Sequence, residues 1–425
     1  MTERQATGLY DPAFERDSCG FGLIANLDDL PSHWVVETAI SALARLTHRG
    51  AVAADGKTGD GCGLLIKFPK AFLRAVGEEL GFELGERFAT GTVFLHQDEN
   101  KAAIARELID TAIHEIGLEV AGWREVPTDP SVCGEQALNT LPRIEQVYVN
   151  AADGMPRGRF NRRLFLARRR AEKRIGEGHA YVASLSSATI SYKGMIMPTA
   201  LTDFYPDLKD PRIESSVCLF HQRFSTNTLP QWRLAQPFRF LAHNGEINTI
   251  QGNRNWALAR AKNFISDKLD DISDLDPIVS LVGSDSSTLD NMLEVMRAGG
   301  MDVLQGMRIL LPPAWQAADD IDPDVRAFYE FFDCQMEPWD GPAGIVLTDG
   351  RYAACCLDRN GLRPARYVVT KDRHITVASE IGVYDYEEKD VISKGRLGPG
   401  EMLAVDLVNG RLLENDDIHD ILKTR

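Results

Sequence analysis

Residues 14–26 read FERDSCGFGLIAN and place Cys19 directly after a charged leader. The residues that follow, Gly20–Ile24, form a glycine-spaced apolar run that predicts a buried β-strand. A cysteine at the start of such a strand is most often a small buried hydrophobe. The alternative is an N-terminal nucleophile, because removal of residues 1–18 would free an α-amino group with a pKa of about 7.7–8.0, a suitable base for the Cys19 thiol.

Composition and charge argue against several classes of function. The 425 residues carry a formal net charge of -15, and a nucleic-acid partner requires a positive field, so we expect none. No apolar run approaches the roughly 20 residues that span a bilayer, and charges interrupt the leader. We therefore expect a cytoplasmic protein without a membrane partner. The 7 cysteines form no CxxC pair and the 9 histidines form no HExxH motif, which predicts reduced thiols and no metal site.

Hydrophobic periodicity predicts an alternation of helices and strands up to about residue 150 and a strand-rich region from residue 181 onward. Asp349-Gly350 and Asn409-Gly410 each predict a tight β-hairpin, so the later sheets are expected to be antiparallel. The basic stretch at 155–174 predicts an amphipathic helix that faces solvent or another part of the domain rather than nucleic acid. Helices are predicted within residues 31–50, 70–80, 99–116, 249–263, 286–298 and 323–333, and strands within 61–68, 89–96 and 181–192. Together these elements predict one elaborate domain of layered sheets with helices outside.

Three further stretches contain side chains suited to binding a small zwitterion. Arg223 ends a predicted strand, where its guanidinium could hold a carboxylate through two hydrogen bonds. Asn244 and Gly245 follow another strand and combine an amide side chain with an accessible backbone N–H, as an oxyanion hole requires. Asp285 begins a predicted helix and could pair with an ammonium group. Singly, these residues also fit a structural ion pair, a turn and a helix N-cap.

Together with Cys19, these residues are the parts needed to hold an α-amino acid and attack its side-chain carbonyl. The chain from Cys19 to about Leu413 resembles the glutaminase domain of glutamate synthase in many ordered motifs. These motifs are CGFG at 19, THRGAVAADGKTGDGCG at 47, DFYPDL at 203, HQRFSTNTLPQW at 221, AHNGEINTIQGNRNW at 242, GSDSSTLDN at 283, DRNGLRPARY at 358 and ASEIGV at 378.

The resemblance implies a class II glutamine amidotransferase with an α+β fold, the four-layer αββα sandwich of N-terminal-nucleophile hydrolases. Residues 1–18 are then expected to be a propeptide, and residues 19–425 the amidotransferase domain. The resemblance further implies that Cys19 is the nucleophile exposed by processing. Asn244 and Gly245 are expected to form the oxyanion hole.

For the substrate, the resemblance implies that Arg223 holds the α-carboxylate of glutamine and Asp285 its α-amino group. Arg49 of the HRG motif is similar to an arginine that lies near the nucleophile in this family. Cys62 is a departure, because small residues such as alanine are usual at its position. We favour core packing over a redox role for this second thiol.

The function implied is hydrolysis of L-glutamine to L-glutamate and ammonia through a cysteinyl thioester. The ammonia would pass to 2-oxoglutarate in a synthase region, and FMN and an iron–sulfur cluster are expected only there, so none is expected in this chain. Two alternatives remain. One is an amidohydrolase of the same fold with another substrate. The presence of both Arg223 and Asp285 disfavours it, because most substrates of such enzymes lack a free α-amino acid group. The other is an unprocessed, non-catalytic glutamine-sensing domain.

Overall fold

The computed structural model describes residues 19–176, 178–223, 228–269 and 273–425, and the predicted propeptide lies outside them. Residues Gly20–Asn26 form strand β1, which is buried along its whole length. Its side chains alternate, with Phe21 and Leu23 in one apolar core and Ile24 in another core on the opposite face. A strand with two apolar faces is stable only inside a sheet that is covered on both sides.

Strand β1 is accordingly the middle strand of a seven-stranded antiparallel sheet within the described residues. In spatial order the strands are β14 (Val391–Arg396), β12 (Arg366–Thr370), β13 (His374–Ala378), β1, β8 (Val217–Gln222), β2 (Cys62–Lys67) and β7 (Thr189–Gly194). Gly20 of β1 lies opposite Gln222 of β8. This register directs Cys19, just before β1, toward Arg223, just after β8.

A second antiparallel sheet of five described strands contains both predicted hairpins. In spatial order the strands are β16 (Arg411–Leu413), β15 (Met402–Asp406), β11 (Tyr352–Leu357), β10 (Ala343–Thr348) and β9 (Leu241–Gly245). Gly350, with a φ of 81°, connects β10 to β11, and Gly410, with a φ of 61°, connects β15 to β16. Both hairpin predictions are therefore confirmed. Strand β9 lies at the edge of this sheet.

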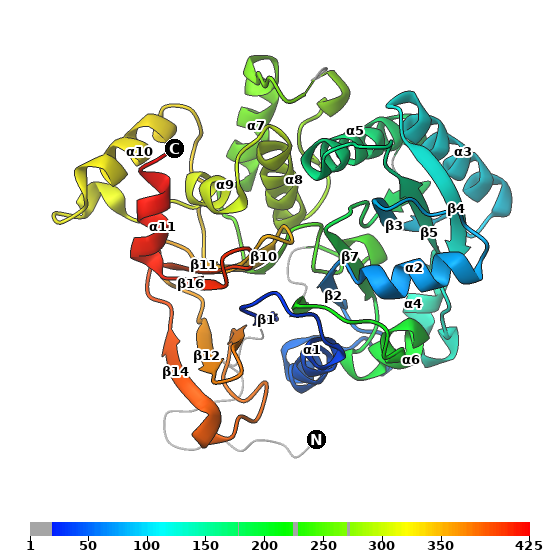
Figure 1. The fold of residues 1–425 in the computed structure, drawn as a ribbon, viewed down its shortest axis with the longest axis horizontal. Helices are drawn as coiled ribbons and strands as arrows, with labels where there is room; N and C mark the ends of the chain where they lie inside the picture. The colour runs from blue at the N-terminus through cyan, green and yellow to red at the C-terminus, as the bar shows by residue number, and fades with distance from the viewer. Residues whose placement is uncertain (1–18, 177, 224–227, 270–272) are drawn as a thin grey trace.

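The two sheets and their covering helices form four layers (Figure 1). Phe21 of β1 packs with Val346 of β10 and Cys355 of β11 in the core between the sheets. The outer face of the larger sheet is covered by α1 (His33–Arg45), and that of the smaller sheet by α8 (Asp285–Ala298), α9 (Val303–Leu310), α10 (Pro323–Asp333) and α11 (Asn415–Leu422). The remaining described α-helices include α2 (Lys70–Glu79), α4 (Glu135–Asn139), α6 (Leu201–Phe204) and α7 (Ile250–Arg260). The predicted αββα sandwich is confirmed.

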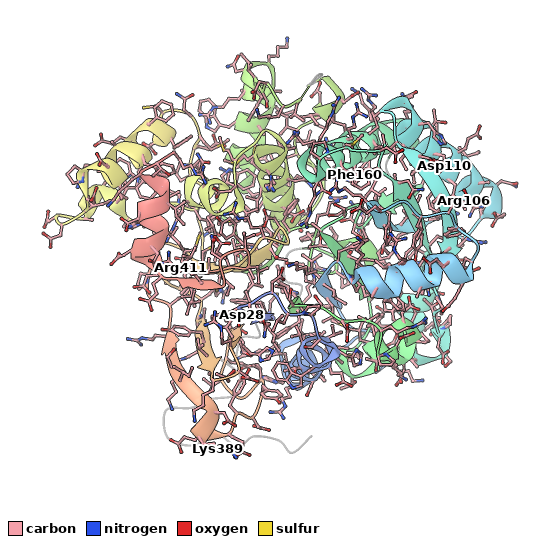
Figure 2. All side chains as sticks on the ribbon, viewed as in Figure 1. Asp28, Arg106, Asp110, Phe160, Lys389 and Arg411 are labelled. Atoms are coloured by element: carbon pink, nitrogen blue, oxygen red, sulfur yellow. The ribbon has the colours of Figure 1, made fainter. Side chains whose placement is uncertain are left out.

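A third sheet extends the sandwich on one side. Its strands are β4 (Glu119–Glu125), β5 (Arg143–Asn150), β3 (Phe88–Leu95) and β6 (Ala180–Val182), and α3 (Glu99–Glu115) and α5 (Arg157–Ile175) pack together beside it. Phe160 of α5 belongs to their shared core (Figure 2). On α3, Arg106 donates to Glu145 of β5 at 2.7 Å, and Asp110 accepts from the Trp123 indole of β4 at 2.9 Å. Polar bonds therefore hold α3 to two strands of this sheet.

The prediction of one continuous strand over residues 181–192 is wrong. The structure divides these residues into β6 of the third sheet and β7 of the seven-stranded sheet. The break includes Ser186, which forms an isolated bridge with Thr90 of β3, and Ser187, and both serine hydroxyls make hydrogen bonds there. Ser187 donates to Asn161 of α5 at 2.8 Å, and the Ser186 hydroxyl accepts from the Ala188 N–H at 2.9 Å.

The sequence predicts that the basic helix α5 faces either solvent or another part of the domain, and the structure shows that it packs against the domain. Arg168 is only 2% exposed and forms ion pairs with Glu172 of the same helix and with Glu294 of α8. Glu172 also pairs with Arg239, which precedes β9, at 3.0 Å. This buried charge network connects α5 to α8 and to the chain leading into β9. No helix among the described residues is both long and apolar enough to cross a membrane.

We predict that Gly22→Ala destabilises the fold, because a Cβ there would lie 2.3 Å from the Phe220 ring and 2.6 Å from the Val377 carbonyl oxygen. Overpacking of this kind costs about 1–3 kcal/mol. Gly252→Ala on α7 is the matched control, since its Cβ would meet nothing within 4 Å. Thermal unfolding should show a lowered Tm for Gly22→Ala only. Equal Tm values for the two variants would contradict this account of β1.

Candidate active site

A cavity of about 350 Å³ opens where β1, β8, β9 and α8 meet, and its lining includes Cys19, Arg223, Gly245 and Asp285. These residues are widely separated in the sequence. The β1–β8 register accounts for the closeness of Cys19 and Arg223, and the remaining two come from the end of β9 and the start of α8. The structure therefore brings four of the six predicted site residues to one cavity.

The two thiols suggested by the sequence lie in different environments. Cys19 is partly exposed and lines the cavity. Cys62 is fully buried in the core beneath α1, where its thiol donates to the Ile196 carbonyl oxygen at 3.1 Å. Burial raises the pKa of Cys62 far above its ordinary value, so this thiol stays protonated. Cys62 is therefore a packing residue, as predicted.

Arg223 is a buried cation at the wall of the cavity, with 5% of its surface exposed. Its guanidinium donates to the Thr228 hydroxyl at 2.6 Å, and its backbone N–H donates to the Gly61 carbonyl oxygen at 2.8 Å. Burial lowers the pKa of Arg223, while nearby Cys19 and other acidic groups act to raise it. An arginine remains protonated under such conditions and favours an anionic ligand.

Asp285 is the first residue of α8, and its carboxylate is fixed by backbone donors. One oxygen accepts from the Ile247 N–H at 2.8 Å and the other from the Ser286 N–H at 2.7 Å. The N-cap is Ser284, whose hydroxyl accepts from the Ser287 N–H, so the interpretation of Asp285 as the N-cap is wrong. The cavity therefore carries a held carboxylate as well as the Arg223 guanidinium.

The end of β9 supplies Asn244 and Gly245. Because Ala242 faces the core between the sheets, strand alternation places Asn244 on that same face, toward β1. The Asn244 side-chain oxygen is buried and accepts no hydrogen bond within the described part of the chain. Gly245 has a φ of 141°, and a Cβ there would lie 1.7 Å from the Pro342 carbonyl oxygen. The backbone at this point therefore requires glycine, and the simple turn interpretation is wrong because Gly245 ends a paired strand.

Arg49 lies against β1 near Gly20, where its side chain would be 3.2 Å from an added Cβ. Its guanidinium pairs with Glu380 at 2.7 Å, and His48 pairs with the same carboxylate at 2.9 Å. Burial acts to raise the pKa of Glu380, but Arg49 and His48 hold this pKa below its ordinary value. Arg49 thus neighbours the first residue of β1, directly after Cys19, and its role toward a ligand stays a prediction.

Sequence reasoning missed other residues that line the cavity, among them Gln236, Arg254 and Ser286. Arg254 of α7 donates to the Gly283 carbonyl oxygen at 2.6 Å and to the Thr288 hydroxyl at 2.9 Å, and so braces the start of α8. Arg254 and Ser286 lie inside motifs already used for the resemblance, but Gln236 lies between motifs and had no pattern to mark it. Across the described ranges, no cluster of three or more histidine, cysteine or acidic side chains could hold a metal ion.

The chain matches the family of class-II glutamine amidotransferases over residues 19–425. It belongs to that family. The chain is 42% identical over 424 residues to the glutamate synthase [NADPH] large chain of Bacillus subtilis (strain 168), covering 99% of this chain and 28% of that protein. It is 43% identical over 410 residues to ferredoxin-dependent glutamate synthase 2 of Synechocystis sp. (strain ATCC 27184 / PCC 6803 / Kazusa), covering 95% of this chain and 26% of that protein. This amidotransferase chain therefore spans about a quarter of the length of these relatives.

Among solved structures, the allosteric regulatory enzyme of purine biosynthesis matches with a TM-score of 0.43 and 12% identity, covering 93% of this chain and 48% of that one. Within this amidotransferase, the two sheets and their flanking helices form the predicted four-layer αββα sandwich. The family match over residues 19–425 confirms the predicted family, and the arrangement of sheets and helices confirms the predicted fold.

A buried histidine, His221 of β8, makes the stability of this amidotransferase depend on pH. Burial lowers the pKa of His221 to about 3, and its Nε2 lies 3.2 Å from the His243 carbonyl oxygen. The unfolded chain, with an ordinary histidine pKa of about 6.5, binds a proton that the folded chain does not. Stability from this histidine is therefore complete above pH 6.5 and is lost as the pH falls toward 3.

We predict that the stability advantage of the wild type over His221→Gln shrinks by up to about 1.4 kcal/mol per pH unit below pH 6.5. The variant has no group that titrates in this window at position 221, and other titrating groups cancel in the difference. Urea unfolding of both proteins at several pH values between 5 and 8 measures the gap. A gap independent of pH would show that His221 does not stay neutral in the folded protein.

Proposed function

We propose that this chain hydrolyses L-glutamine to L-glutamate and ammonia, with Cys19 as the nucleophile after removal of residues 1–18. The observation that carries the proposal is the placement of Arg223 and Asp285 on one cavity with Cys19. A guanidinium and a carboxylate held in this way complement the α-carboxylate and α-amino groups of a free amino acid. A ligand bound by both groups extends its side chain toward the rest of the cavity, where the thiol lies.

The reaction begins with transfer of the Cys19 thiol proton to the freed α-amine of the same residue. The sulfur attacks the amide carbon of glutamine, and the carbon–nitrogen bond breaks as the nitrogen takes up that proton and leaves as ammonia. Water then attacks the γ-glutamyl thioester, which releases glutamate and regenerates the thiol. The start of the family match at Cys19 supports this assignment.

Each addition step places negative charge on the former carbonyl oxygen. We assign its stabilisation to the Asn244 side-chain amide and the Gly245 backbone N–H. The Asn244 side chain is buried, and the pairing of β9 with β10 fixes the backbone that carries the Gly245 N–H. Donors held in place before the reaction stabilise an oxyanion without the cost of reorganisation.

In the wider protein, we propose that this chain is the ammonia-supplying part of a glutamate synthase. The names and identities of the relatives support this role. Ammonia would then pass to 2-oxoglutarate in a synthase region that also holds FMN and an iron–sulfur cluster. We expect this enzyme to act in the cytoplasm.

Cys19→Ala should abolish glutaminase activity, because no other thiol in the described chain lines the cavity. Cys62→Ala is the matched control and should retain most activity, since its thiol is buried in the core. Steady-state ammonia release measures both variants, and intact mass shows whether the active protein starts at Cys19. Full activity in protein that retains residues 1–18 would rule out the N-terminal-amine mechanism.

Asn244→Ala and Asp285→Asn should separate catalysis from binding. Loss of one oxyanion donor lowers kcat by about 100- to 1,000-fold, and we expect KM of Asn244→Ala to change little. Asp285→Asn removes the charge that pairs with the substrate ammonium, so kcat/KM should fall by about 100-fold, mainly through KM. Steady-state glutaminase kinetics on both folded variants test this. An increase in KM at unchanged kcat in Asn244→Ala would place the oxyanion site elsewhere.

A further inference from the structure

One buried side-chain amide, that of Gln236, connects the two elements that carry the oxyanion and ammonium sites. We infer that Gln236 is a positioning residue that holds the end of β9 against the first turn of α8. This inference rests on the proposed glutaminase function, because it assigns Gln236 an effect through Asn244 and Gly245. Gln236 is 4% exposed and reaches the cavity wall between these elements.

Strand β9 is the edge strand of its sheet among the described residues, so one side of its backbone has no described strand beside it. His243 of β9 lies opposite Ile345 of β10, and Gln236 bonds to both backbone polar groups of His243. The Gln236 oxygen accepts from the His243 N–H at 2.7 Å, and the Gln236 amide nitrogen donates to the His243 carbonyl oxygen at 3.3 Å. The Gln236 side chain thus bonds to both backbone groups as a neighbouring strand would, and His221 Nε2 also lies 3.2 Å from the same carbonyl oxygen.

The Gln236 amide also reaches α8. Its nitrogen lies 3.4 Å from the Ser286 hydroxyl, which in turn lies 2.9 Å from Nδ1 of His243. Gln236, His243 and Ser286 therefore form a closed triangle of buried polar contacts. Burial lowers the pKa of His243, so its ring is neutral at neutral pH and the triangle carries no net charge.

The triangle adjoins catalytic groups on both sides. His243 directly precedes Asn244, and Ser286 directly follows Asp285 and donates its backbone N–H to that carboxylate. A shift of β9 along its edge would therefore move the oxyanion donors relative to the held substrate. Because oxyanion stabilisation depends on donor placement within a few tenths of an ångström, loss of Gln236 should act mainly on turnover.

The kinetic test compares Gln236→Ala with Gln146→Ala, a matched control in the third sheet. Gln146 is likewise fully buried and hydrogen-bonded, to Arg124 and Tyr192, and lies outside the cavity lining. We expect Gln236→Ala to lower kcat at least about 10-fold with KM changed less than about 3-fold, and Gln146→Ala to leave both near wild type. A dominant rise in KM would instead make Gln236 a substrate-binding residue and overturn the positioning role.

A double-mutant cycle with Asn244→Ala tests whether Gln236 acts through the oxyanion site. Once Asn244 is removed, adding Gln236→Ala should lower kcat by a smaller factor than it does in the wild type, because one of the two donors that Gln236 positions is gone. Full multiplication of the two single effects would overturn the inference.

Hydrogen exchange of the intact protein gives a measurement independent of activity. Amides of residues 241–247 should exchange faster in Gln236→Ala than in the wild type and Gln146→Ala. Unchanged exchange in this segment would overturn the positioning role even in an active enzyme. An inactive wild type would instead refute the proposed function, while the exchange result would still decide whether Gln236 holds β9.

Discussion

The antiparallel pairing of β1 with β8 is the constraint on which the site depends. It sets Gly20 opposite Gln222, so the residues just beyond the pair, Cys19 and Arg223, meet at one end of the sheet. The pairing is specified by apolar side chains on both faces of β1, and a slip of one residue would exchange those faces. The same burial that stabilises the sandwich therefore also sets the distance between the thiol and the guanidinium.

Backbone groups, more than side-chain ion pairs, fix the positions of the polar groups around the cavity. Asp285 is held by two peptide N–H groups, and Gly245 is paired with Ala343 of β10 at a point where the Pro342 carbonyl leaves no room for a side chain. For the proposed zwitterionic substrate, such a site would have little to reorganise on binding, which lowers the free-energy cost of binding and of charge development. The buried network of Arg168, Glu172 and Glu294 supports the same region from behind α8.

Much of this architecture could be predicted from local patterns. The apolar spacing in β1, the glycine turns at 350 and 410 and the ordered motifs around Arg223, Asn244 and Asp285 each leave a signal in the sequence. The division of residues 181–192 between two sheets leaves no signal in the sequence, because the hydrogen bond from Ser187 to Asn161 depends on tertiary contacts. Gln236 was missed for the same reason, since one glutamine at a strand edge has no periodicity.

The central position of β1 has a further consequence in the proposed mature protein, where the polypeptide would begin at Cys19. Chain ends normally fray, because nothing precedes them to limit their motion. Here the terminal residue would adjoin a strand with hydrogen-bonded neighbours on both sides, β8 and β13. A reactive amine and thiol could then stay in register without any residue in front of them. Folding of the sheet would already order the terminus, so ligand binding would not have to supply that conformational entropy.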